Sequence, residues 1–189
     1  MRTIFSTPVV VDILNPIARF FRWLIGWKFV GDPPPAEKYV IIAAPHTSNW
    51  DFVMFLLFII ERRLALRWMG KHTLFKWPFG GVMRWLGGIP IERSTNHNTV
   101  QQMVDAFSEP DPIVLVITPE GTRSKVEKWK TGFYHIAVAA GVPISQGFLD
   151  KRKKICGFGP WFEPSGDLDD ELPRIRAFYE GMQGLRRRD

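Results

Sequence analysis

Short apolar runs alternate with amphipathic stretches along most of the chain. The predicted strands are apolar runs, several of them rich in β-branched residues, at residues 39–43, 64–69, 88–91, 113–117, 143–148 and 154–158. The predicted helices follow 3.6-residue patterns at residues 49–62, 96–107, 131–140 and around 175–182. The run at 113–117 is continuously apolar, as expected of a strand covered on both faces of a sheet. This alternation predicts one α/β domain with a mostly parallel or mixed central sheet flanked by helices.

Residues 1–31 form an apolar segment that we separate from the domain predicted at 36–189. Asn15-Pro16 resembles a helix start, with Asn as the cap and Pro at the first helical position. The apolar surface of this segment includes Ile17, Phe20, Phe21, Trp23, Leu24, Trp27 and Phe29. The basic side chains beside it are Arg19, Arg22 and Lys28. A helix packed on its own core is one interpretation, and the aromatic and basic content favours the other, an amphipathic helix in a membrane interface.

The most informative polar residues follow the first strand of the domain, in a turn that leads into a buried helix. His46 lies on this turn, and Asp51 falls in the first turn of the helix. A carboxylate there can orient one imidazole nitrogen and leave the other free as a base. Asp51 also completes a capping box with Ser48, so a purely structural role is the alternative.

A second polar group follows the strand at 113–117 and is predicted to reach the same edge of the sheet. Glu120 could position a substrate or brace an arginine, Gly121 allows a tight turn, and Thr122 offers a hydroxyl. Arg123, together with Arg93 after an earlier strand, could hold a phosphate through forked hydrogen bonds, with surface ion pairing as the alternative.

Two other side chains have less definite expected roles. Lys71, at another strand end, is either a solvated lysine or a phosphate contact. His135, inside the helix at 131–140, is expected to be structural.

His46 and Asp51, with four residues between them, resemble the H-x-x-x-x-D motif of the glycerolipid acyltransferase superfamily, which includes the lysophosphatidate acyltransferases. Pro119-Glu120-Gly121-Thr122-Arg123 is similar to its E-G-T-R block. Residues 87–93 are similar to its G-x-x-F-I-x-R block, with Pro90 where Phe is usual, and residues 141–144 resemble the start of its fourth block. The resemblance implies the acyltransferase αβ fold with a helical, membrane-binding N-terminal motif.

The resemblance also implies a reaction in phospholipid biosynthesis, the transfer of a fatty acyl group from a thioester to the hydroxyl of a lysophospholipid. The expected acceptor is 1-acylglycerol 3-phosphate. His46 is the expected base and Asp51 its partner, while Arg93 and Arg123 are expected to bind the acceptor's phosphate. The sequence lacks a Gly-x-Ser-x-Gly elbow, so we expect direct attack on the thioester without an acyl-enzyme, with backbone amides near His46 as oxyanion donors.

Composition narrows the partners and the setting. The net charge of +6 and the content of eight Trp and fifteen Phe favour binding to an anionic membrane surface. Proteins that bind single-stranded nucleic acid also combine basic and aromatic side chains. A single cysteine, Cys156, rules out an internal disulfide and is expected to be buried. No signal peptide is evident, which fits a peripheral, monotopic protein on the cytoplasmic face of a membrane.

The expected partners are an acyl thioester, on CoA or on acyl carrier protein, a lysophospholipid and the membrane. We expect no nucleic acid, and, without phosphate-loop, dinucleotide or zinc motifs, no metal and no tightly held cofactor. Three other functions stay open at this point: an acyltransferase of the same superfamily with a different acceptor, a non-catalytic module that binds lipid or nucleic acid, and a hydrolase that uses the same base on water.

Overall fold

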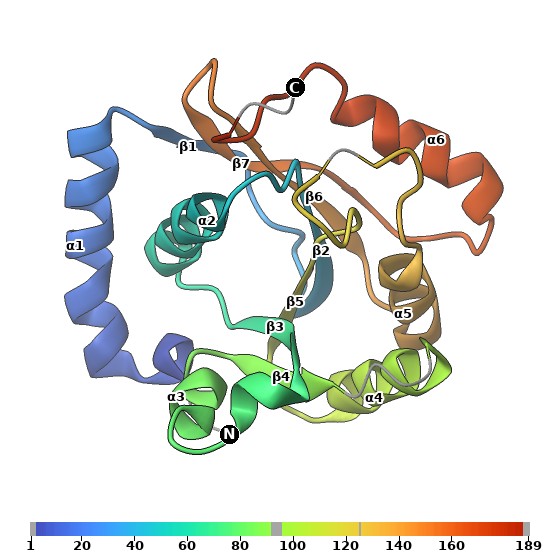
Figure 1. Ribbon diagram of the computed structural model, residues 1–189, viewed down its shortest axis with the longest axis horizontal. Coiled ribbons are helices and arrows are strands. Elements are labelled where there is room, and N and C mark those ends of the chain that lie inside the picture. The colour runs from blue at the N-terminus through green and yellow to red at the C-terminus, as the bar shows by residue number, and fades with distance from the viewer. Residues whose placement is uncertain (1–2, 92–95, 125, 187–189) are drawn as a thin grey trace.

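The computed structural model describes residues 3–91, 96–124 and 126–186 (Figure 1). Seven strands form one sheet in the order β1-β7-β6-β2-β5-β3-β4. Neighbouring strands run parallel, except that β7 is antiparallel to β6. The predicted α/β domain with a mostly parallel sheet is therefore confirmed.

The strands and helices have bounds close to those predicted for most of the domain. The strands are β1 (Lys28–Val30), β2 (Lys38–Ala44), β3 (Leu66–Lys71), β4 (Gly88–Ile91), β5 (Ile113–Ile117), β6 (Ile144–Asp150) and β7 (Ile155–Phe162). The helices are α1 (Pro8–Ile25), α2 (Asn49–Arg62), α3 (Gly80–Trp85), α4 (Asn96–Ser108), α5 (Gly132–Ala140) and α6 (Leu168–Phe178). Two short 3-10 helices complete the list, η1 (Ile4–Ser6) and η2 (His72–Phe75). The sequence patterns did not predict β1, α3, η1 or η2.

The sheet has one hydrophobic core on each face, and β2 contributes alternate residues to both. Tyr39 and Ile41 pack with Phe58 of α2 in the first core. Val40 and Ile42 pack in the second core, which contains side chains of α4, α5 and α6, such as Phe133. Figure 1 shows this layering, with α1 and α2 on one side of the sheet and α4, α5 and α6 on the other. A strand buried on both faces explains why residues 39–44 are apolar without alternation.

The N-terminal helix begins earlier than the Asn15-Pro16 pattern predicted. It starts at Pro8, and Pro16 lies inside it. Asn15 is no cap: its buried side-chain amide donates to the carbonyls of Ile60, at 3.1 Å, and Glu61, at 2.9 Å. These carbonyls belong to the last turn of α2, and that of Ile60 also accepts the backbone N–H of Arg63 at 3.2 Å. Asn15 therefore joins α1 to α2.

Two aromatic residues and one arginine of this segment also lie elsewhere than predicted. Trp27 is 7% exposed and belongs to the core on the α2 side, and Phe29 lies in β1. Arg22 pairs with Glu61 at 2.8 Å, so it does not point freely toward solvent. The apolar surface of α1 is consequently narrower than the sequence indicated, although still large.

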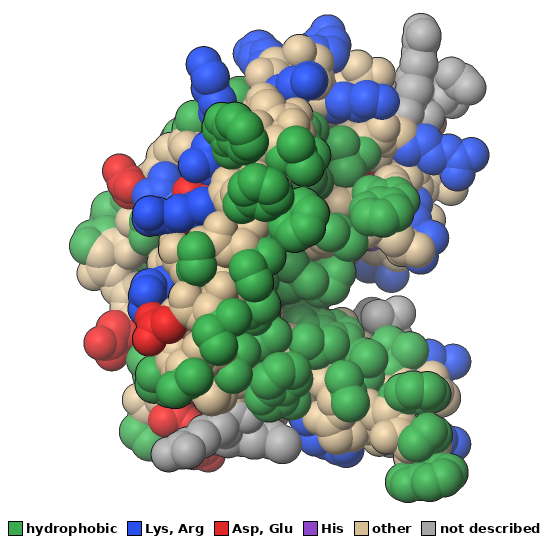
Figure 2. Space-filling model, turned by 90° about the vertical axis from the view of Figure 1, so that its left-hand side faces the viewer, with side chains coloured by type: hydrophobic (Ala, Val, Ile, Leu, Met, Phe, Trp, Pro, Cys, Tyr) green, Lys and Arg blue, Asp and Glu red, His purple; other side chains and the backbone are tan. Residues whose placement is uncertain are grey.

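The outer face of α1 is apolar and exposed. Its exposed apolar side chains are Val9, Ile13, Ile17, Phe20, Phe21, Trp23, Leu24 and Ile25. A second group of exposed apolar side chains, Leu74, Trp77, Phe79, Val82 and Trp85, lies on η2, α3 and the loop between them. Figure 2 views the molecule from the side of α1 and shows hydrophobic side chains gathered on this face, beside a hollow. In the part of the chain that the structure describes, no helix combines the length and apolarity needed to cross a membrane.

Candidate active site

The sheet topology explains how His46 and Glu120 come together from distant parts of the sequence. β2 and β5 are parallel neighbours, with Ile42 paired to Ile117. His46 follows the carboxyl end of β2, and Glu120 follows the carboxyl end of β5. Both side chains therefore lie at the edge where parallel α/β sheets usually bind their ligands.

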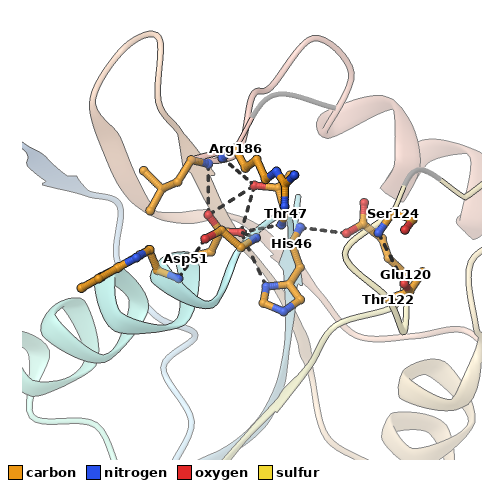
Figure 3. A network of polar contacts seen from close by, with 10 residues as sticks. His46, Thr47, Asp51, Glu120, Thr122, Ser124 and Arg186 are labelled. Atoms are coloured by element: carbon orange, nitrogen blue, oxygen red, sulfur yellow. Dashed lines mark hydrogen bonds and ion pairs between the residues drawn. The ribbon is translucent and has the colours of Figure 1, made fainter. Parts of the chain in front are cut away.

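Asp51 is the centre of the hydrogen-bond network at this edge (Figure 3). It is 6% exposed, and its Oδ2 accepts the backbone N–H groups of Thr47 and of Ser48, the latter at 2.6 Å. Oδ2 also lies 3.1 Å from the Thr47 hydroxyl and 3.6 Å from His46 Nδ1. The capping box and the contact with His46 thus exist together, since one carboxylate makes both. His46 Nδ1 faces Asp51, which leaves Nε2 as the nitrogen for acid–base chemistry.

Glu120 supports the backbone of the turn after β2, a role that the sequence did not predict. Its Oε2 accepts the backbone N–H of His46 at 2.8 Å, and the residue is 7% exposed. This bond ties the loop after β5 to the turn after β2.

The suggestion that amides near His46 stabilise the oxyanion is not supported by this geometry. The N–H of His46 is bonded to Glu120, and those of Thr47 and Ser48 to Asp51. All three amides are therefore occupied by carboxylates.

A large, mostly apolar cavity of about 1220 Å³ opens at His46 and runs between the sheet and the helices. Its apolar wall includes Phe52, Val53, Phe55, Trp68, Met69, Ile91, Val100, Ile136 and Phe148. Cys156 also lines it, and burial raises the pKa of this thiol to about 12. His135 is exposed and lines the same cavity, 3.4 Å from the Thr131 hydroxyl, and its structural role stays a prediction.

A smaller cavity of about 450 Å³ shares His46, Thr118 and Gly121 with the large one and is lined further by Thr122 and Arg123. Gly121 has φ of 64°, and a Cβ there would lie 2.8 Å from the side chain of Lys130, so the turn requires glycine. The exposed Thr122 accepts the N–H of Ser124 at 3.4 Å. The loop after β5 thus brings a guanidinium and a hydroxyl to a polar recess that the imidazole of His46, from the turn after β2, also lines.

Of the two other predicted phosphate contacts, the structure describes only one. Lys71 is exposed at the end of β3 and lines neither of them. Arg93 lies outside the described residues, as does Glu92, so its predicted role stays a prediction.

The site also contains residues that no sequence motif indicated. Thr47 is 4% exposed and bonds Asp51, and the backbone of residues 185–186 reaches the same network from the far end of the chain. Arg186 is exposed and donates its backbone N–H to the Thr47 hydroxyl at 3.0 Å, while Arg187 and Arg188 lie outside the described residues.

Comparison with known proteins agrees with this geometry. The family model described as Acyltransferase matches residues 27–145. The 1-acyl-sn-glycerol-3-phosphate acyltransferase of Haemophilus influenzae is 32% identical over 207 residues, covering 96% of this chain and 83% of that protein. The chain belongs to the acyltransferase family. It is therefore an O-acyltransferase, as the sequence motifs predicted.

Further similarities extend this assignment. The Escherichia coli protein of the same name is 36% identical over 121 residues, 59% of this chain and 48% of that protein. The crystal structure of the acyltransferase PlsC from Thermotoga maritima superposes with a TM-score of 0.61 at 18% identity, covering 97% of this chain and 83% of that one. This structural similarity supports the fold.

Proposed function

We propose that this acyltransferase moves a fatty acyl group from a thioester to the free hydroxyl of 1-acylglycerol 3-phosphate. The observation that carries the proposal is the place of His46, which lines both a large apolar cavity and a small polar one. The large cavity suits an acyl chain, and the small one suits an anionic headgroup beside Arg123. The names of the relatives from H. influenzae and E. coli support the same acceptor.

In the proposed reaction, His46 Nε2 takes the proton of the acceptor hydroxyl as its oxygen attacks the thioester carbonyl. The carbon–sulfur bond then breaks, and the departing thiolate takes the proton from the imidazolium. Asp51, 3.6 Å from Nδ1, stabilises the imidazolium that forms in between. General-base catalysis of this kind contributes about 10²–10⁴ in rate. The reaction needs no redox or metal cofactor, since the thioester already carries an activated acyl group.

Arg123 is the proposed phosphate ligand among the described residues. Its guanidinium can form two parallel hydrogen bonds to phosphate oxygens, which a lysine cannot do. Arg93 is the proposed second ligand on the grounds of the sequence motif. The acyl donor in this proposal is a thioester of CoA or of acyl carrier protein.

We further propose that the enzyme docks on the cytoplasmic face of an anionic membrane through α1 and the η2–α3 segment. On α1, Phe20 is 55% and Trp23 71% exposed; on the second segment, Trp77 is 93% and Phe79 66% exposed. Residues 64–91 contain four Lys or Arg and no Asp or Glu, which fits an anionic surface. Basic and aromatic side chains with this exposure are typical of proteins that lie in the bilayer interface.

Docking of this kind would bring the acyl chains to the cavity without a passage through water. Phe52 and Val53 line the large cavity and are also 37% and 40% exposed, so the apolar surface continues from the outside into the cavity (Figure 2). Moving an acyl chain through water would cost about 0.8 kcal/mol for each CH₂ exposed.

The acceptor is tested by supplying the purified protein with acyl-CoA or acylated carrier protein and a panel of lysophospholipids on vesicles. We expect transfer to 1-acylglycerol 3-phosphate, and slower transfer to acceptors whose phosphate carries a further headgroup. Faster transfer to a headgroup-bearing lysophospholipid would refute the proposed acceptor. Thioester consumption without an acylated lipid would identify a hydrolase instead.

Membrane docking is tested by sedimentation with vesicles of anionic phospholipid. Phe20→Ser with Trp23→Ser, and separately Trp77→Ser with Phe79→Ser, should each reduce the bound fraction. The control is Val138→Ser on α5, an apolar side chain of 42% exposure outside both surfaces. Substitution is preferable to deleting residues 1–29, since Phe5 and Trp27 are buried in the core. Sedimentation equal to that of the control in both double variants would contradict the docking proposal.

A further inference from the structure

The chain returns to the active site after α6. Residues 183–186, which we call the C-terminal strap, lie against the turn between β6 and β7. The backbone N–H of Lys151 donates to the carbonyl of Gln183 at 2.7 Å, and Lys151 Nζ donates to the carbonyl of Leu185 at 2.9 Å. The strap is thereby held in one place over the amino end of α2.

Two backbone N–H groups of the strap point into the catalytic network (Figure 3). The N–H of Leu185 donates to Asp51 Oδ1 at 3.0 Å. The N–H of Arg186 donates to the Thr47 hydroxyl at 3.0 Å, and this hydroxyl lies 3.1 Å from Asp51 Oδ2. Since the Thr47 oxygen accepts from Arg186, its own proton is directed toward Asp51. The strap therefore supplies one direct and one relayed hydrogen bond to the carboxylate.

The strap can approach so closely because its second residue is glycine. A Cβ on Gly184 would lie 2.3 Å from Thr47 Oγ1 and 2.5 Å from Thr47 Cγ2. Any side chain at this position would push the strap away from Thr47 or displace Thr47 itself. The close contact between the strap and Thr47 thus depends on a single glycine, Gly184. This residue lies outside the family motifs found in the sequence.

We propose that the C-terminal strap is a positioning element of the active site, which fixes the Asp51 carboxylate so that Oδ2 stays beside His46 Nδ1. The turn after β2 supplies N–H donors to Oδ2 on one side, and the strap supplies the Leu185 N–H to Oδ1 on the other. Held from both sides, the carboxylate cannot rotate away from the imidazole. This inference rests on the proposed role of His46 as the base.

The test compares two substitutions at one position in the full chain. Leu185→Pro removes the N–H that Asp51 accepts, whereas Leu185→Ala shortens the side chain and keeps the N–H. We expect kcat to be about ten- to a hundredfold lower in Leu185→Pro than in Leu185→Ala, the range for a hydrogen bond to a charged group, with the acceptor KM changed less than threefold. A merely structural role would lower the fraction of folded enzyme and leave kcat per folded molecule equal in the two variants.

A second readout needs neither donor nor acceptor, so it stays informative if the proposed acceptor is wrong. Amide hydrogen exchange at Thr47 and Ser48 should be faster in Leu185→Pro than in Leu185→Ala, since a mobile Asp51 protects these N–H groups less. Equal exchange and equal kcat in the two variants would overturn the strap proposal. If Leu185→Pro fails to fold, Thr47→Val and Thr47→Ser replace it as the pair. The hydrogen bond relayed through the Thr47 hydroxyl then predicts a kcat at least about tenfold lower in Thr47→Val than in Thr47→Ser. Equal kcat values in these two variants would refute it.

Discussion

Replacing Asp51 with Asn removes one charge from the active site and nearly preserves the shape of the side chain. Asp51 Oδ2 lies 3.6 Å from His46 Nδ1. With an effective dielectric constant of about 20, two unit charges at this distance attract each other by about 5 kcal/mol. In the proposed mechanism this attraction arises only when His46 is protonated, which happens as it takes the proton of the acceptor hydroxyl that attacks the thioester. Its loss should lower kcat by up to about five thousandfold.

The same substitution should also destabilise the fold, by a smaller amount. Both oxygens of Asp51 accept backbone N–H groups, Oδ1 from Leu185 and Oδ2 from Thr47 and Ser48. An Asn side chain has one oxygen, so its NH₂ group must face at least one of these donors. An unpaired buried donor costs about 1–3 kcal/mol. In a chain of this size each kcal/mol lowers Tm by about 2–4 °C.

The assay is the rate of thiol release from acyl-CoA in the presence of 1-acylglycerol 3-phosphate, with Tm measured by calorimetry on the same samples. Asp12→Asn is the matched control, since Asp12 is exposed and pairs with Arg63 away from the site. We expect the control to keep its kcat while Asp51→Asn loses most of it at temperatures where both are folded. If Asp51→Asn retains kcat within about threefold, Asp51 is only a helix cap and the account of the catalytic pair is wrong.

Three other substitutions test separate parts of the structure. Arg123→Ala should raise the KM for the acceptor at least about tenfold and leave the KM for the donor nearly unchanged, since it removes a charged ligand of the acceptor's phosphate. Equal effects on the two KM values would refute the proposed phosphate-binding role of Arg123. Burial raises the pKa of Cys156 from 9.0 to about 12, so its thiol stabilises the fold fully below about pH 9 and loses this contribution as the pH rises toward 12. The free energy of unfolding should therefore fall less between pH 8 and 11 in Cys156→Ala than in the unsubstituted chain, and parallel curves would contradict the burial effect. Asn15→Ala should lower the free energy of unfolding, measured in urea, by about 1–3 kcal/mol, since it removes the two buried hydrogen bonds that Asn15 donates to the carbonyls of Ile60 and Glu61. An unchanged midpoint would refute the proposed stabilising contact between α1 and α2.

The parts of the fold and the site that the sequence predicted correctly depend on local pattern. The strand before His46, the cap at Ser48 and the helix that follows are all encoded within the continuous stretch 38–62, by apolar runs and capping residues. Gly121 was predicted as a turn residue, and its positive φ agrees. The motif around it further indicated that two strand ends would meet at one edge.

The parts that the sequence did not predict depend on contacts between distant residues. Asn15 resembles a helix cap locally, but its hydrogen-bond partner Ile60 lies 45 residues away at the end of α2. Leu185 reaches Asp51 across 134 residues, through a backbone N–H that carries no residue-specific signal. Trp27 has the aromatic character of an interface residue, yet the pairing of β1 with β7 draws its neighbours into the sheet and buries it. Such contacts follow from strand order, which periodicity along one chain does not determine.

The central claim is that His46 activates the hydroxyl of 1-acylglycerol 3-phosphate for direct attack on an acyl thioester. Its most direct test is the transfer of a labelled acyl group from CoA or acyl carrier protein to 1-acylglycerol 3-phosphate on vesicles, by the unsubstituted chain and by His46→Ala in parallel. We predict labelled diacylglycerol 3-phosphate from the unsubstituted chain, and a rate at least about a hundredfold lower from a folded His46→Ala variant. Equal product formation by both proteins, or no product from the unsubstituted chain with either donor, would contradict the account.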